Sequence, residues 1–395
     1  EKTLLLLVSF MEPHAKKTRV ELKRVRVVLC GASSWAQGWH LPQLRRNPSV
    51  ELVAIVDPAM VTWSKYNLDM KPTKELAEMY QVPVFEDFAE FLRSGLVEAT
   101  DGAIISSTHT THGSLGLQAA DANLHIFMEK PMTTNALEAR KLHAAAAVLK
   151  SHGKVFMVNH SANFTKQALK AREYVRDGRI GEIEHVTCYM IREREFFEDP
   201  SNRLWVSSSE ASIGNGFAWG QTCHTLAWVY MVTGLRPKSV FCKMVCSAQT
   251  GADIFTSAII DCTNGASITC QGLAGLPGGN SVGSALKKGR LIENKIFGSK
   301  GCLFYSGDDA EPSSGQLEVL CHDGFNESVP DFHFENTTKE GLGPESLRSF
   351  LDACRGELVV NPADAEIGLL VVETIETMYK SAKAGVVQPI HETAT

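Results

Sequence analysis

Apolar and polar positions between residues 24 and 158 follow one repeated pattern. Short runs of β-branched and aliphatic residues alternate with longer stretches in which apolar residues recur at helical spacing. The runs predicted as strands are 25–29, 52–56, 82–85, 103–105, 125–128 and 155–158. Asn135, with Glu138 three residues later, predicts the start of the last helix between them. Buried strands that alternate with helices are typical of a parallel, doubly wound sheet.

Beyond Asn159 the apolar runs become longer and alternate with a period of two. A helix over 166–177 comes first, and the runs predicted as strands are 184–194, 239–245, 255–262, 266–271, 295–305 and 316–322. Asn264-Gly265 stands between two of these runs and predicts a hairpin. We expect antiparallel strands in one open sheet, helices over 217–232 and 363–384, and loops over 272–284 and 308–315.

The two patterns predict an α/β protein of two domains, which a length of 395 residues also favours. The first, over 24–158, would hold a doubly wound parallel sheet. The second, over 159–390, would be an α/β domain with a large, open, mostly antiparallel sheet. Residues 1–23 contain one short apolar run followed by basic residues, and we expect them to be an extension outside the fold.

Composition narrows the class of protein. A net charge of -6 without a long basic tract speaks against nucleic-acid binding. The apolar run at 4–8 is far shorter than a membrane span requires, so no membrane partner is expected. The 10 cysteines are scattered, which favours reduced thiols and a cytoplasmic location. Only Cys242 and Cys246 are spaced like metal ligands, and on a strand they more often pack than bind, so we expect no metal.

A glycine-containing turn between the first strand and the first helix is the first candidate binding site. The segment Gly31 to Ala36 reads GASSWA, a degenerate form of the dinucleotide-binding pattern with Ser33 at the second glycine position. The candidate cofactor residues in it are Gly31, Ser33, Ser34, Trp35 and Ala36. Asp57, at the end of the second strand, would bind the adenosine ribose hydroxyls and repel a 2′-phosphate, which favours NAD over NADP. A tight turn in an unrelated doubly wound protein is the alternative.

A second candidate, Glu129-Lys130-Pro131, follows the fifth strand directly. The carboxyl edge of a doubly wound sheet is where such folds bind ligands. Pro131 restricts Lys130 to an extended conformation, which would aim its amine into the crevice. On these residues alone, a surface turn with a solvated lysine fits as well.

From about Arg24 to Ile390 the chain resembles the glucose-fructose oxidoreductase, inositol dehydrogenase and MocA family of NAD(P)-dependent oxidoreductases. The segments that carry the resemblance are Gly31 to Ala36 with His40-Leu41-Pro42, Ser107-Thr108 with His112, Glu129-Lys130-Pro131, Asn159, and the segments 178–181, 298–301 and 350–353. The resemblance implies a Rossmann domain that binds NAD. It also implies cofactor contacts from Ser107, Thr108, His112, Glu129, Lys130 and Asn159.

The family's second catalytic segment is a helix with the pattern D-x-G-x-H. His224 matches the histidine, but the aspartate position falls on Gly220, and Gln221 lies three residues before His224. The resemblance implies that Lys130 and His224 form an acid/base pair, with Gln221 as an orienting group, while hydride passes to C4 of the nicotinamide. Which of the two carries the proton stays open. Without the resemblance, His224 also fits a core histidine in an apolar helix.

The resemblance also supplies the substrate class, a secondary alcohol or ketone of a sugar, polyol or related cyclic compound. We expect Trp205, Trp219, Gln221 and His224 to contact it, since aromatic rings pack on the C–H faces of sugars. A core or an oligomer interface explains the aromatic residues equally well. Three arginines are candidates for binding a carboxylate or hydroxyls, with surface salt bridges as the alternative: Arg192, Arg194 and Arg203.

Two other functions remain open, and we expect a homo-oligomer formed through the second sheet in any case. A cofactor-binding sensor without turnover is favoured by Gly220, whereas the presence of both Lys130 and His224 speaks against it. A dehydrogenase of a non-sugar, such as a dihydrodiol or a tetrapyrrole, is the other possibility.

Overall fold

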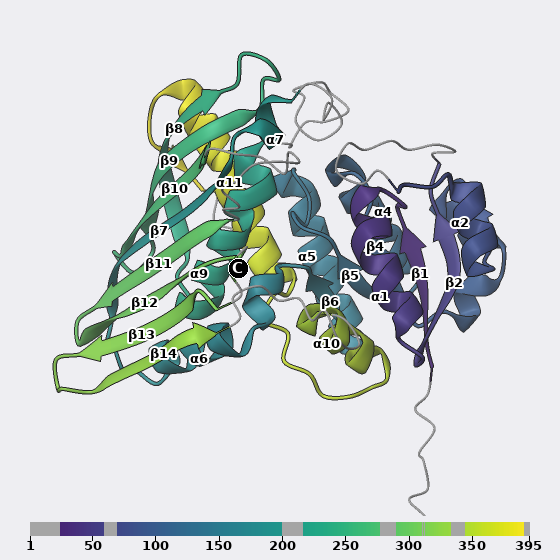
Figure 1. Ribbon diagram of the computed structural model, residues 1–395, viewed down its shortest axis with the longest axis horizontal. Helices are drawn as coiled ribbons and strands as arrows, with labels where there is room; N and C mark the ends of the chain where they lie inside the picture. Colours follow the sequence, from purple (N-terminus) through teal and green to yellow (C-terminus); the bar gives the residue numbers. More distant parts are fainter. Residues whose placement is uncertain are drawn as a thin grey trace, which may run out of the picture.

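Two sheets with helices packed on them make up the protein (Figure 1). The computed structural model describes residues 24–58, 69–199, 216–276, 290–309, 311, 313–332 and 344–390. The predicted extension over 1–23 therefore lies outside the described residues. Among these residues no helix is both long and apolar enough to cross a bilayer.

The first sheet has six parallel strands in the order β3-β2-β1-β4-β5-β6. Its strands are β1 (Val25–Cys30), β2 (Val50–Val56), β3 (Val84–Phe85), β4 (Gly102–Ile105), β5 (His125–Met128) and β6 (Phe156–Val158). Its helices are η1 (Ala36–His40), α1 (Leu41–Arg46), α2 (Thr73–Tyr80), α3 (Phe88–Arg93), η2 (Leu96–Ala99), α4 (His109–Asp121) and α5 (Ala136–Ser151). This is the doubly wound order of the Rossmann fold, and it confirms the predicted fold class.

The second sheet has nine strands in the order β14-β13-β12-β11-β7-β10-β9-β8-β15. They are β7 (Ile183–Glu193), β8 (Pro237–Cys246), β9 (Asp253–Cys262), β10 (Ser267–Leu276), β11 (Leu291–Gly298), β12 (Gly301–Asp308), β13 (Gly315–Cys321), β14 (Asn326–Phe332) and β15 (Gln388–Pro389). The sheet is mostly antiparallel, as predicted. The pair β7 and β10 is parallel, and the chain between them contains several helices and two strands, enough for the crossover that parallel strands need.

Details of the second sheet correct the sequence analysis. The run 295–305 is two strands, β11 and β12, with a turn at Ser299-Lys300, since alternation continues on both sides of a tight hairpin. The loop predicted from residue 272 is wrong over its first part, where β10 continues to Leu276. The hairpin at Asn264-Gly265 is confirmed, and Gly265 takes the positive φ of 91° that favours glycine there.

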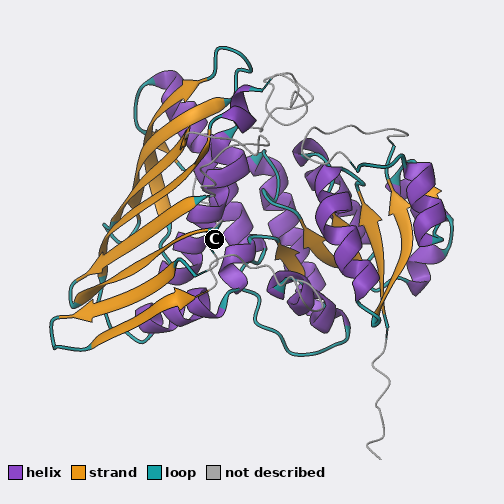
Figure 2. Ribbon diagram, in the orientation of Figure 1, coloured by secondary structure: helices purple, strands orange, loops and turns teal. Residues whose placement is uncertain are grey.

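Helices cover one face of the second sheet (Figure 2). They are η3 (Ser161–Phe164), α6 (Lys166–Arg176), α7 (Glu195–Glu198), η6 (Ala218–Thr222), α9 (Cys223–Thr233) and α11 (Ala365–Ala384). Nearly all of α9 is buried: the ring of Trp228 lies 4.6 Å from that of Tyr305 in β12, and the Tyr230 hydroxyl lies 2.7 Å from that of Thr374 in α11. Helix α9 is thus fixed between the sheet and α11.

Helix α10 (Glu345–Cys354) brings the C-terminal part of the chain back to the first sheet (Figure 1). The ring of Phe350 lies 5.2 Å from that of Phe127 in β5. A Cβ at Gly102 in β4 would lie 2.8 Å from the Phe350 ring, so the strand needs glycine there. The domain limits at residues 158 and 390 stay predictions. Helix α10 follows residue 158 in the chain, yet it completes the core of the first sheet.

Candidate active site

The glycine turn after β1 touches the loop after β4, where the strand order of the first sheet reverses. Gly31 has a φ of 93°, and a Cβ on it would lie 2.5 Å from the Cα of Ser107. The Ser33 hydroxyl donates to the carbonyl of Ser106 at 3.2 Å. The backbone N–H of Ala32 donates to the carboxylate of Asp57. The fold therefore brings the predicted residues Gly31, Ser33, Asp57 and Ser107 to one place.

These residues fit a dinucleotide. The turn presents backbone without a side chain, and the helix that opens around Ser34, Trp35 and Ala36 offers its N-terminus. The Ser106 hydroxyl is buried there, with no hydrogen-bond partner among the described residues. A carboxylate, Asp57, stands at the end of β2, where a Rossmann fold binds ribose. In Rossmann folds, backbone N–H groups and a helix N-terminus bind the pyrophosphate, and an acidic side chain binds the ribose.

Glu129 is a buried anion that connects the first helix to β5. Its Oε1 accepts hydrogen bonds from Trp35 Nε1 at 2.9 Å, His40 Nε2 at 2.9 Å and Asn159 Nδ2 at 2.7 Å. Burial opposes ionisation, but the donors His40 and Asn159 and the charge of Lys130 outweigh it, so the pKa of Glu129 falls to about 2. Direct cofactor contact by Glu129 and Asn159 stays a prediction.

The π-helix η1 explains how two side chains reach one carboxylate. In a π-helix, backbone hydrogen bonds join residues five apart, so Trp35 and His40 follow each other on one face. The ring of Trp35 also stacks on that of Trp39, with centroids 5.2 Å apart. Sequence reasoning noted His40 only as part of the resemblance and gave it no role.

His112 joins the loops that follow β4 and β5. Its Nδ1 lies 2.8 Å from the carbonyl oxygen of Pro131, and its Nε2 lies 3.2 Å from that of Ser107. Burial lowers the pKa of this imidazole. Thr108 occupies the N-cap position of α4 without a side-chain cap. The structure places His112 beneath the predicted cofactor loop, and contacts of Ser107, Thr108 and His112 with a cofactor stay predictions.

Lys130 spans the two halves of the protein. Its amine donates a hydrogen bond to the backbone carbonyl of Gly220 at 2.8 Å, and Gly220 lies in the π-helix η6 that leads into α9. Burial is the main cause that lowers the pKa of Lys130. A Cβ at Gly220 would meet no atom within 4 Å, so the position where the family carries aspartate is open space here.

His224 lies in the first turn of α9, one helical turn after Gly220. Its ring lies 5.9 Å from that of His160, and the two planes are nearly perpendicular. Burial, followed by the positive charge of Lys130, lowers the pKa of His160 to about 3 and that of His224 well below its usual range. Both imidazoles are therefore neutral beside a buried amine, and a neutral imidazole offers one hydrogen-bond donor and one acceptor.

Several polar atoms in this region are buried with no hydrogen-bond partner among the described residues. They include both ring nitrogens of His160 and Oε1 of Gln221. Buried polar atoms are normally paired, so unpaired ones are expected where a ligand or water supplies the partner. Gln221 lies in η6, three residues before His224, and its role stays a prediction, while the sequence analysis did not single out His160.

Asp253 fixes the start of the helix that carries His224, and the sequence analysis missed it. This buried carboxylate accepts from the Ala218 N–H at 2.8 Å and from the Tyr379 hydroxyl of α11. A Cβ at Gly216 would lie 1.7 Å from Asp253 Oδ1, so only glycine fits there. A single aspartate at the first position of a strand does not predict such a role from sequence, because its partners lie far away in the chain.

The predicted substrate residues are distributed unevenly. Trp219 is 4% exposed, and its ring stacks on that of Tyr379, 6.0 Å away, so its role toward a substrate stays a prediction. Trp205 and Arg203 lie outside the described residues. Arg194 forms an ion pair with Glu198 at 3.0 Å, in line with the salt-bridge alternative.

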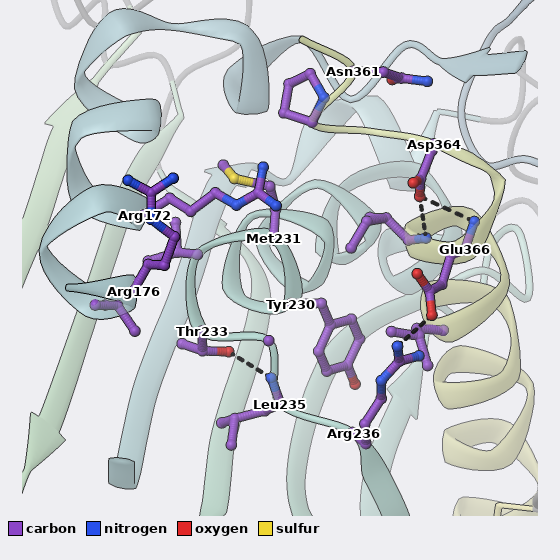
Figure 3. A pocket seen from close by; sticks show the side chains of 16 residues that line it. Arg172, Arg176, Tyr230, Met231, Thr233, Leu235, Arg236, Asn361, Asp364 and Glu366 are labelled. Carbon is purple, nitrogen blue, oxygen red and sulfur yellow. Dashed lines mark hydrogen bonds and ion pairs between the residues drawn. The ribbon is translucent and has the colours of Figure 1, made fainter. Parts of the chain in front are cut away.

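One cavity of the described structure lies away from this site (Figure 3). It has a volume of about 420 Å³ and lies at the other end of α9, beside Tyr230 and Met231. Arg236 pairs with Glu366 there, and Asp364 caps α11. None of the predicted site residues lines it. Elsewhere, the described residues contain no group of three His, Cys, Asp or Glu side chains placed to hold a metal ion.

Comparisons with known proteins place both halves of the chain in one family. Residues 25–160 match the family described as the oxidoreductase family with an NAD-binding Rossmann fold. Residues 168–304 match the GFO/IDH/MocA C-terminal domain. The two matches together cover more than half of the chain.

Individual relatives are distant. The uncharacterized oxidoreductase YrbE of Bacillus subtilis is 23% identical over 78% of this chain and 81% of its own length. The inositol 2-dehydrogenase of Rhizobium meliloti is 26% identical over 67% of this chain and 73% of its own length. An Agrobacterium radiobacter oxidoreductase, solved with NAD+, L-tartaric acid and magnesium, has a TM-score of 0.68 at 16% identity and covers 93% of this chain and 99% of its own.

Proposed function

The chain belongs to the GFO/IDH/MocA family of NAD-binding oxidoreductases, and from this premise we propose that it oxidises or reduces a sugar, polyol or related cyclic compound. The reaction would interconvert a secondary alcohol and a ketone. One observation carries the proposal: the buried Lys130 amine, from the NAD-binding half, bonds to Gly220 in the helix that carries His224. The Lys130 amine from one half of the chain and the Gly220 carbonyl from the other thus meet at one place.

In the proposed reaction the alcohol loses a hydride from its carbon and a proton from its hydroxyl. NAD+, when bound, supplies the carbon that accepts the hydride. Lys130 and His224 are the proposed acid/base pair, one of which accepts the hydroxyl proton as the C–H bond breaks and the C=O bond forms. Burial lowers the pKa of Lys130, which makes the amine easier to deprotonate, and it keeps His224 neutral, so that the imidazole can also position the hydroxyl by a hydrogen bond. The Lys130 amine would reach the reacting oxygen in place of the Gly220 carbonyl.

A hydroxyl-rich substrate suits the unpaired polar atoms beside His224. The ring nitrogens of His160 and Oε1 of Gln221 would gain partners from substrate hydroxyls. The similarity to inositol 2-dehydrogenase supports the same class. Gln221 would orient the substrate, as the sequence analysis proposed.

NAD is the proposed cofactor in preference to NADP. Asp57 stands at the end of β2 and bonds to the Ala32 N–H, which holds its carboxylate beside the glycine turn. An acid there favours free ribose hydroxyls and repels a 2′-phosphate. An Asp57→Ala variant should bind NADPH more tightly relative to NADH than the unchanged protein does.

A cofactor-binding sensor is the second candidate function. The missing carboxylate at Gly220, with open space around it, is the observation that favours it. The sensor would bind NAD and small molecules without turnover, and it makes the opposite prediction for the assay below.

The experiment that tests the proposal has two steps. In the first step, NADH or NADPH is titrated into the protein and binding is measured by tryptophan fluorescence. Trp35 can report the binding because it lies at the start of the helix that opens at the glycine turn. A panel of sugars, inositols and diols with NAD+ then measures turnover by absorbance. Binding with turnover supports the dehydrogenase, and binding without turnover on any panel member supports the sensor. If neither nucleotide binds, the assignment of the Gly31 turn is wrong.

A further inference from the structure

Two arginines occupy the helix-covered face of the second sheet, at one end of its central strands. Alternate residues of β7 up to Met190 are buried, and Arg192 is the next residue on that face. In β11, Asn294 and Ile296 are buried, and Arg290 lies on the same face, directly before the strand. Successive residues of a strand point to opposite faces, so both arginines point to the side on which α9 packs.

The strand register makes these arginines direct neighbours. Strands β7 and β11 are antiparallel, with Leu291 opposite Ile191, so the next position places Arg290 opposite Arg192. Like charges in directly opposite positions destabilise a sheet. The arrangement therefore requires negative charge nearby.

Each arginine pairs with a carboxylate, and the charge of Asp309 acts on both of them. Arg192 donates to both oxygens of Glu193, at 3.2 and 3.0 Å. Arg290 pairs with Asp309 on the far side, in β12's continuation. Glu193 and Arg192 are thus chain neighbours on β7, and Arg290 and Asp309 continue the row across the sheet. Every arginine carries five N–H donors, and Arg192 uses two of them in its bonds to Glu193.

The row lies within electrostatic reach of the proposed reacting groups. After burial and Lys130, the charges of Arg290 and Arg192 also lower the pKa of His224, and both act on Lys130 in the same direction. Gly220 contributes no carboxylate to offset them. The charges of both arginines therefore act on the two groups proposed to react.

We infer that the substrate of this site carries an anionic group, a carboxylate or a phosphate, which Arg192 and Arg290 bind together. The inference rests on the proposed function and names its substrate class more narrowly. Guanidinium groups present paired N–H donors that match the two oxygens of either anion, and such charge-assisted pairs are stronger than bonds to neutral hydroxyls. An anion between the two arginines also relieves their repulsion.

The first test measures anion binding by thermal unfolding, with and without NADH. Malonate probes a carboxylate site and inorganic phosphate a phosphate site, each against chloride at equal ionic strength. The variants are Arg192→Met, which removes the charge but keeps an apolar side chain, and Arg192→Lys, which keeps the charge but loses the paired donors. Arg236→Met, half exposed and paired with Glu366 at the far end of α9, is the matched control.

Malonate, phosphate or both should raise the melting temperature of the unchanged protein and of Arg236→Met. They should raise the melting temperature of Arg192→Met much less. The probe that stabilises more identifies the anion. Without anion, Arg192→Met should melt lower than the unchanged protein, because the buried Glu193 loses its partner, so each variant's shift is measured from its own melting temperature without anion. If neither anion exceeds chloride, or if Arg192→Met and Arg192→Lys respond like the unchanged protein, the inference is wrong.

The second test uses matched substrates with NAD+: glucose, glucuronate and glucose 6-phosphate, and the corresponding galactose series. An anionic member should show a KM about tenfold or more below that of its neutral partner, and Arg192→Met should abolish the difference. Equal KM values in both series would overturn the inference while leaving the proposed function in place. Failure to bind NADH would instead overturn the proposed function.

Discussion

Lys130 has two properties that rarely occur together in one lysine: it is buried, and its amine bonds to a backbone carbonyl from a distant part of the chain. Burial lowers its pKa and so makes the amine easier to deprotonate. The bond to Gly220 fixes its position before a substrate arrives. A lysine with these properties suits a role at the reacting oxygen.

A Lys130→Met variant should lose turnover by about 10²-fold or more, the usual effect of removing an acid/base group. Its affinity for NADH should change little. Steady-state kinetics and the NADH titration measure the two effects separately. Lys380→Met, an exposed lysine on α11, is the control and should keep both. Unchanged turnover in Lys130→Met would show that the site lies elsewhere.

Glu129 makes a second prediction at this scale, about stability and pH. Its folded pKa of about 2 lies below the ordinary 4.5, so its stabilising effect is complete above pH 4.5 and is lost as the pH falls toward 2. The shift corresponds to about 3 kcal/mol of unfolding free energy at neutral pH. Glu129→Gln should therefore melt well below the unchanged protein at pH 7, and the difference should shrink as the pH falls from 4.5.

Melting curves at several pH values measure that difference, and Glu138→Gln, in the first turn of α5, offers a comparison. A difference between Glu129→Gln and the unchanged protein that stays constant down to pH 3 would contradict the buried anion.

Single residues were predictable where chemistry lies in a short segment. Gly31 and Lys130 stand in local patterns directly after strands, and the structure places both at the carboxyl edge of the first sheet. Asp253 and Arg290 were missed, because each acquires its role from a partner across the fold: Tyr379 for the first and Arg192 for the second. No local pattern records such a pairing.

At the scale of elements, strands were predicted best, because an apolar period of two is visible without knowledge of the partners. The parallel pair of β7 and β10 was not predictable, since it depends on how the chain crosses over between them. The π-helices η1 and η6 were also missed. Their sequences suit an α-helix, and the wider turn is set by what the side chains bind.

Asp253 tests the importance of one such element. Asp253→Ala would leave the Ala218 N–H and the Tyr379 hydroxyl buried without their acceptor, at a cost of about 1–3 kcal/mol for each. We expect a lower melting temperature and a lower kcat, because the helix that carries His224 loses its anchor. Asp253→Asn keeps one acceptor oxygen and should recover part of both. Equal kcat values in the two variants and the unchanged protein would rule out a positioning role.

At the scale of the whole molecule, the two sheets are not independent of each other. Helix α10 from the C-terminal part completes the core of the first sheet, and Lys130 from the first half bonds into η6 of the second. Sequence order predicted two consecutive units and could not show this return, because the apolar face of α10 does not reveal which sheet it covers.

The outer face of the second sheet leads to a prediction about assembly. Ile259, Phe297 and Leu320 point away from the helices and are 51%, 37% and 37% exposed. They lie on β9, β11 and β13, and apolar side chains exposed on one face of a sheet favour a protein interface. We propose a homo-oligomer through this face, which light scattering coupled to size exclusion would detect. Ile259→Lys should shift it toward the monomer, whereas Val148→Lys, on the exposed side of α5, should not. A monomer at high concentration would contradict the proposal.

The two π-helices hold the same dipeptide from opposite sides: η1 places Trp35 and His40 on Glu129, and η6 places the Gly220 carbonyl on Lys130. A π-turn holds about one residue more than an α-helical turn, so loss of one codon within either segment would return it to ordinary α-helical pitch and leave later side chains pointing in nearly the same direction. Trp35 and His40 would then be four residues apart and would still share one face of the helix. The wider turn in each helix therefore acts as a single-residue insertion, and its removal in frame is a change that keeps the proposed site aligned.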